Sequence, residues 1–89
     1  SDEAHGDLVL DPATPHLPTA TLGDAVAART ITLLAPSKTW NLPGLGCAFA
    51  IIPDPLLRRR FKDAGRGLVP HVNLMGLTAA QAAYQHGGP

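Results

Sequence analysis

Two short runs of apolar and β-branched residues constrain the fold of this chain most. They are TITLL at 30–34 and CAFAII at 47–52. Neither run alternates with polar residues beyond threonine, which is typical of strands buried on both faces of a sheet. The connection between them, about a dozen residues, is too short for an ordinary helical crossover. We therefore expect two neighbouring strands, the second running antiparallel to the first.

Helix signals alternate with these strands. Asp54 followed by Pro55 is an N-cap with proline at the first helical position, and glycines 65 and 67 should end that helix. Either Asn73 or Thr78 could cap a last helix that ends near residues 86–87, and Asn73 is the better candidate. Strands alternating with helices indicate the α/β class.

The first thirty residues are less regular. DLVL at 7–10 predicts a short extended segment, and 11–20 is a loop with three prolines. The spacing from Thr21 to Asp24 matches a capping box and predicts a short helix over 22–29. Pro-bearing connections of this length are unusual in a compact small domain. We therefore expect the chain to be a piece of a larger domain.

Composition excludes several classes of partner. Seven basic residues balance seven acidic ones among 89 residues, which argues against nucleic acid or an anionic membrane as a partner. No apolar run approaches the length of about 18–20 residues that a membrane span requires. The single cysteine, Cys47, excludes an internal disulfide framework and fits a reducing compartment such as the cytoplasm. His16, His71 and His86 lack metal-ligand spacing, so no metal site is expected.

Two segments carry candidate chemistry. SDEAH opens the chain, and Ser37-Lys38 follows the first predicted strand. Taken alone, each has an ordinary explanation: an Asp-Glu pair is commonly solvated surface, and a lysine after a strand commonly packs its stem and keeps its amine in water. Their combination is more informative than either segment.

The combined pattern resembles a known family. SDEAHGDLVL, followed some thirty residues later by APSKTWNLPGLGCAFAIIP, resembles the large domain of fold-type I pyridoxal-phosphate (PLP) enzymes. More narrowly, it resembles the cystathionine β-lyase branch of the class I/II aminotransferase family, and the resemblance covers essentially the whole chain. That branch reads S-D-E-I-H-x-D-L and A-P-S-K-T-F-N; here Ala4 replaces the isoleucine and Trp40 the phenylalanine.

The resemblance implies roles for four residues. Lys38 would form the Schiff base with the cofactor aldehyde, and Asp2 would pair with the protonated pyridine nitrogen so that the ring accepts electrons. His5 would lie near the cofactor's 3′ oxygen, although a satisfied histidine at a strand end is the alternative. Ser37 would contact the cofactor phosphate.

The phosphate anchor departs from many relatives. The serine three residues before the lysine and the arginine eight residues after it are here Ala35 and Gly46. Phosphate binding would then depend on Ser37 and on residues outside this chain. The lyase branch often lacks that arginine too, so Gly46 weakens the cofactor argument more than the family assignment.

The resemblance also implies a function. The expected fold is part of the mainly parallel sheet, layered with helices, of the fold-type I large domain, with residues 1–89 a fragment that lacks the N- and C-terminal parts of the enzyme. The expected activity is a carbon–sulfur β-lyase acting on cystathionine or cysteine-conjugate amino acids, releasing a thiol, pyruvate and ammonia. An aminotransferase using the same residues and a non-catalytic fragment are the alternatives. The full-length protein would be a cytoplasmic homodimer, and the 89-residue chain alone would be inactive.

Overall fold

The computed structural model describes residues 1–88 and is centred on one pair of strands. β1 (Thr32–Leu34) and β2 (Phe49–Ile51) pair antiparallel, with Leu33 opposite Ala50. Both predicted strands are confirmed, although each is shorter than its apolar run. The predicted antiparallel direction is confirmed as well. The connection between the strands is a turn with one short 3-10 helix, η2 (Pro43–Leu45).

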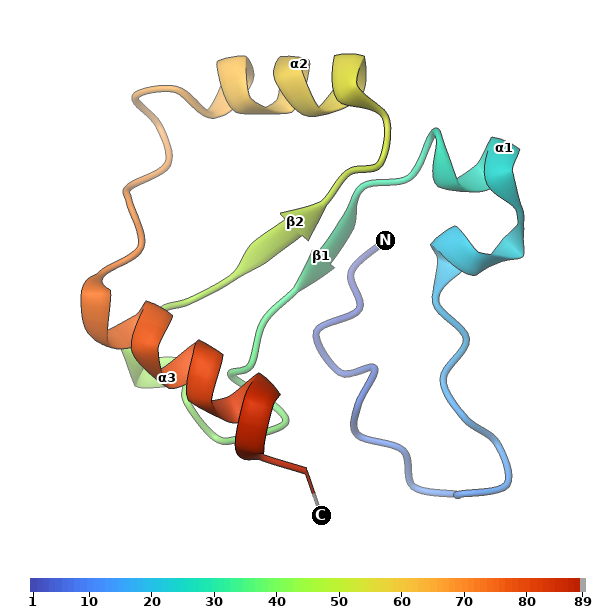
Figure 1. Cartoon of the computed structure of the whole chain (residues 1–89), viewed down its shortest axis with the longest axis vertical. Helices are drawn as coiled ribbons and strands as arrows, with labels where there is room; N and C mark the ends of the chain where they lie inside the picture. The colour runs from blue at the N-terminus through green and yellow to red at the C-terminus, as the bar shows by residue number, and fades with distance from the viewer. Residues whose placement is uncertain (89) are drawn as a thin grey trace.

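Two helices follow, one near each end of the strand pair (Figure 1). α2 (Pro55–Gly65) begins at Asp54, whose carboxylate accepts a hydrogen bond from the Leu57 amide at 2.6 Å. α3 (Leu74–His86) begins at Asn73, whose side-chain oxygen accepts from the Gly76 amide at 2.7 Å. Both predicted caps are confirmed, since each side chain satisfies an amide that the first helical turn leaves free. None of the described helices is long and apolar enough to cross a membrane.

The capping box predicted at Thr21 is wrong. Thr21 lies inside a 3-10 helix, η1 (Thr19–Leu22), and its hydroxyl donates to the Pro18 carbonyl at 2.7 Å. The short helix α1 (Asp24–Ala27) starts only after Gly23, which has φ of 140°. That backbone conformation favours glycine and interrupts the helical conformation between η1 and α1. The Thr21 side chain therefore does not reach the amide that it was expected to cap.

The extended segment predicted at 7–10 is also absent. Residues 4–7 form a turn, and the Leu8 amide donates to the His5 carbonyl at 3.0 Å. Leu8 and Val9 therefore join no strand, and both side chains are exposed. The loop predicted over 11–20 is confirmed only for residues 11–18, because η1 (Thr19–Leu22) begins at Thr19.

The strand pair is open on both faces. Leu33 is 43% exposed on one face, while Phe49 and Ile51 are 39% and 49% exposed on the other. Among residues 1–88 the buried hydrophobic residues are Ile52, Ala80 and Ala83, and Pro36 is fully enclosed. Burial on both faces, predicted from the apolar runs, is thus not found within residues 1–88. The segment is flat, with extents of 36 × 34 × 18 Å.

Candidate functional site

The N-terminal segment lies alongside β1. The Leu33 amide donates to the Ser1 carbonyl at 2.8 Å, and the Glu3 amide donates to the Leu33 carbonyl at 2.9 Å. These bonds form a parallel bridge between Asp2 and Leu33, and Figure 1 shows the start of the chain next to the strand. Asp2 is therefore fixed by main-chain hydrogen bonds beside the strand that leads to Lys38, about thirty residues away in sequence.

Lys38 lies in the turn that follows β1. Pro36, fully buried, begins the turn, and its carbonyl accepts from the Trp40 amide at 3.1 Å. The Ser37 carbonyl accepts from the Leu42 amide at 3.0 Å. Ser37 is half-buried and Lys38 is exposed. The turn is thus anchored at its first residue, and the amine it carries remains accessible.

The two candidate segments adjoin at a second point. The Thr39 hydroxyl lies 3.5 Å from the Asp7 carboxylate, which brings the turn at residues 4–7 next to the lysine turn. His5 is exposed in that turn, and Asp2, also exposed, accepts from the Ala4 amide at 3.2 Å. Within residues 1–88, no hydrogen bond joins the side chains of the four predicted residues to one another. The structure brings their segments together through Thr39 and Asp7, and not through hydrogen bonds between the four predicted side chains.

An aromatic cluster joins the lysine turn to α3 and β2. The Trp40 and Tyr84 rings meet edge to face with centroids 4.8 Å apart, and Phe49 meets Tyr84 at 5.6 Å. The Trp40 indole nitrogen donates to the Gly87 carbonyl at 2.9 Å. Burial, with smaller contributions from Asp7 and Cys47, raises the pKa of the Tyr84 hydroxyl above its ordinary value. The cluster connects α3, β2 and the turn through apolar contact and one hydrogen bond.

Sequence reasoning missed Glu3 as a structural centre. Its side chain is 5% exposed, whereas an Asp-Glu pair near a chain end normally indicates solvated surface. Its carboxylate accepts from the Thr19 amide at 2.9 Å, from the Ser1 hydroxyl at 3.0 Å and contacts the His16 ring nitrogen at 3.2 Å. The Thr19 amide, above all, lowers the pKa of Glu3, with His16 and Ser1 adding to the effect against the opposing influence of burial. No signal in the sequence pairs Glu3 with a histidine thirteen residues away.

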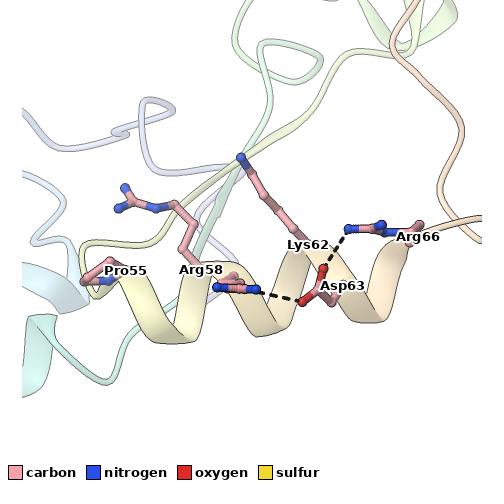
Figure 2. Close-up of a pocket in the computed structure, with 6 residues that line it drawn as sticks. Pro55, Arg58, Lys62, Asp63 and Arg66 are labelled. Carbon is pink, nitrogen blue, oxygen red and sulfur yellow. Dashed lines mark hydrogen bonds and ion pairs between the residues drawn. The ribbon is translucent and has the colours of Figure 1, made fainter.

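Two open cavities lie elsewhere, along α2. One, of about 360 Å³, is lined by basic side chains and Asp63, which pairs with Arg66 at 2.9 Å and with Arg59 at 4.0 Å (Figure 2). The other, of about 510 Å³, lies between the end of α2 and residues 67–72. The arginines at 58–60 are exposed on α2. Neither cavity includes Lys38, Asp2, His5 or Ser37.

Curated relatives share the sequence over its whole length. The chain is 43% identical over 90 residues to the cystathionine beta-lyase PatB of Bacillus subtilis, covering all of this chain and 23% of that protein. It is 31% identical to the cystathionine beta-lyase of Corynebacterium glutamicum, covering 97% of this chain and 23% of the relative. The resemblance to the cystathionine β-lyase branch is confirmed. No protein-family model matches the sequence, and the chain spans about a quarter of the length of these curated relatives.

Solved structures agree with this family resemblance. The fold matches the crystal structure of OvoB with a TM-score of 0.93 at 49% identity, covering 97% of this chain and 23% of that one. It matches cystalysin from Treponema denticola, described as containing a pyridoxal 5′-phosphate cofactor, with a TM-score of 0.86 at 33% identity. That match covers 98% of this chain and 22% of cystalysin. The small two-stranded α/β arrangement is therefore one also found inside larger proteins.

Proposed function

We propose that this chain is a segment of the large domain of a PLP-dependent carbon–sulfur β-lyase acting on cystathionine or related cysteine conjugates. One observation carries the proposal: the Asp2 segment pairs with β1, and β1 leads directly into the turn that bears Lys38. This juxtaposition occurs in a chain whose curated relatives are named cystathionine beta-lyases. The activity belongs to the full-length protein, of which residues 1–89 supply part of the site.

The residue types present suit most of the cofactor. An accessible primary amine (Lys38) suits its aldehyde, a carboxylate on an adjoining segment (Asp2) suits a protonated pyridine nitrogen, and an imidazole (His5) suits a ring oxygen. The phosphate is served less well, because only the Ser37 hydroxyl is offered on the lysine turn. We propose that residues outside this chain complete the phosphate site.

When bound, the cofactor supplies an electron sink that stabilises negative charge at the substrate Cα. Lys38 would hold the cofactor covalently and, once displaced by the substrate amine, would take the Cα proton at its Nζ. The Asp2 carboxylate would hold a proton on the pyridine nitrogen, an interaction that strengthens as charge develops. In a lyase the thiolate would then leave from Cβ. In an aminotransferase no group would leave, and Lys38 would instead return the proton to the cofactor.

The open faces of the strand pair support the proposal of a longer chain. Leu33 on one face, with Phe49 and Ile51 on the other, exposes apolar surface of the kind that a larger sheet covers with helices. We propose that the Ser1–Glu3 segment and β1 are parallel neighbours in the mainly parallel sheet of a fold-type I large domain, with β2 as its antiparallel member. A cytoplasmic homodimer, which the family resemblance implies, is part of the same proposal.

The test uses the full-length protein and its two lysines within this segment. Both Lys38 and Lys62 are exposed, so accessibility alone does not distinguish them. Borohydride reduction followed by peptide mapping should place the cofactor on Lys38, and Lys38→Ala should abolish its retention while the matched control Lys62→Ala leaves it intact. Cofactor on Lys62, or no cofactor on the wild-type protein, contradicts the proposal.

Substrate assays on the same protein then identify the reaction. Pyruvate release from cystathionine without a keto acid supports the lyase. Amino-group transfer to a keto acid without pyruvate release would instead establish the aminotransferase alternative. A protein that binds no cofactor and catalyses neither reaction would be the non-catalytic alternative.

A further inference from the structure

Glu3 is a buried carboxylate that the proposed chemistry does not use. A buried carboxylate is costly unless hydrogen bonds compensate its lost hydration. Here Oε1 accepts from the Thr19 amide at 2.9 Å and the Ser1 hydroxyl at 3.0 Å, while Oε2 faces the His16 Nε2 at 3.2 Å. Both carboxylate oxygens are therefore occupied, and the group is held firmly in one position.

These contacts join three separate parts of the chain. Glu3 sits in the segment that pairs with β1, His16 sits in the proline-bearing loop, and Thr19 opens η1. The His16 ring also packs against the turn at residues 4–7, where a Cβ on Gly6 would lie 2.8 Å from the His16 Cδ2. Loop, turn and strand-pairing segment thus meet at one carboxylate.

Glu3 lies next to Asp2 in the same extended segment, so its contacts affect how Asp2 is oriented. In an extended segment successive side chains point to opposite faces, and here Glu3 is buried while its neighbour Asp2 is exposed. The Glu3 carboxylate therefore anchors the buried face of this segment, and Asp2 lies on its exposed face. Main-chain bonds to Leu33 fix the register of this segment, and Glu3 adds an anchor against rotation about its axis.

We propose that Glu3, braced by His16 and the Thr19 amide, is a positioning residue that orients the Asp2 carboxylate toward the cofactor. The inference rests on the proposed function, because it assumes that Asp2 serves the pyridine nitrogen. Glu3 touches neither substrate nor cofactor; it acts through Asp2. Misplacing a catalytic group by about 1 Å can cost on the order of 100-fold in rate, which sets the scale of the expected effect.

The decisive experiment is a double-substitution cycle in the full-length protein, read as pyruvate release from cystathionine. Glu3→Gln should lower kcat by about 10- to 100-fold while KM changes little. In an Asp2→Asn background, the same Glu3→Gln change should cost almost nothing further, because the group that it positions is already disabled. An equal loss of kcat in both backgrounds, or no loss in either, would overturn the proposal.

A matched control and a cofactor-independent readout accompany the cycle. Asp11→Asn removes a carboxylate of the same loop, one that accepts hydrogen bonds only from Ala13 and Thr14 among the described residues. This variant should leave kcat unchanged. In the cofactor-free protein, Glu3→Gln should speed hydrogen exchange at the Ala4 amide, which donates to Asp2. Unchanged exchange there would contradict the positioning role, even if activity fell.

Two further outcomes are kept distinct. If Glu3→Gln does not fold, His16→Ala replaces it in the same cycle. The His16 side chain is 39% exposed, and its removal leaves two of the three contacts of Glu3. The expected loss of kcat is then about 3- to 10-fold, and it should again be absent in the Asp2→Asn background. A wild-type protein without cofactor on Lys38 would refute the proposed function. Slower exchange at the Ala4 amide in that wild-type protein than in Glu3→Gln would still support the anchor.

Discussion

Substituting Gly76 by alanine should loosen the contact between α3 and the segment after the lysine turn. Gly76 lies buried in the first turn of α3, and a Cβ built on it would stand 2.5 Å from the Leu45 carbonyl oxygen. Ordinary contacts begin at 3.4 Å, and the obstructing atom is main chain, which cannot rotate away. The helix and η2 must therefore separate to admit the methyl group.

The expected magnitude follows from three opposing effects. Alanine gains at most about 1 kcal/mol of helix propensity over glycine, while forcing a methyl group into a filled site typically costs about 1–3 kcal/mol. Separation also weakens the hydrogen bond from the Asn73 side-chain amide to Leu45, 2.8 Å long, worth about 0.5–1.5 kcal/mol. We expect Gly76→Ala to lower the free energy of unfolding of the full-length protein by about 1–3 kcal/mol.

Urea unfolding of the full-length protein measures this change, with Gly44→Ala as the matched control. Gly44 belongs to η2 itself, yet a Cβ there meets nothing within 4 Å among the described residues. Its substitution should be neutral or stabilising by up to about 1 kcal/mol, through a less flexible unfolded chain. A Gly76→Ala protein as stable as the Gly44→Ala protein would refute the close approach of α3 to η2.

Two further predictions concern the aromatic cluster and Glu3. Trp40→Phe keeps an aromatic ring against Tyr84 but removes the indole donor to Gly87, so it should cost about 0.5–1.5 kcal/mol in urea unfolding and speed hydrogen exchange at the end of α3; unchanged stability and exchange would show that the bond is not formed. The pKa of Glu3 is lowered by folding, so its contribution to stability is present above the unfolded pKa of about 4.3 and is lost as pH falls through the lower folded value. Unfolding midpoints followed from pH 7 to pH 3 should accordingly fall more steeply in the wild type than in Glu3→Gln, and parallel curves would count against this.

Local signals predicted both strands and the two capped helices, but not the structure of residues 7–10 or the start of the first helix. Asp54 and Asn73 cap their helices because their side chains reach amides only three residues away, a distance that the sequence itself contains. The antiparallel strands followed from the length of the connection between them. The Thr21 prediction failed although it used the same rule, because Gly23 adopts a φ of 140° and interrupts the helix before the cap can form.

The candidate site residues were proposed from the sequence, but their surroundings were not predicted. Asp2 and Lys38 were singled out because the two segments that carry them together resemble the cystathionine β-lyase branch. The role of Glu3 depends on His16 and Thr19, brought to it by the path of a proline-bearing loop. No periodicity records such a contact, since neither partner lies at a helical or strand spacing from Glu3.

The sequence by itself therefore determined the strands and the capped helices, because each depends on residues near one another along the chain. The candidate site residues came from the family resemblance of two separate segments. The tertiary structure alone decided which carboxylate of the Asp2-Glu3 pair is buried and that α3 approaches η2 at Gly76. It also decided that the turn at residues 4–7 adjoins the lysine turn through Asp7 and Thr39. These features arise from packing between segments distant in sequence, because a polar group can be buried only where another segment supplies its hydrogen-bond partners.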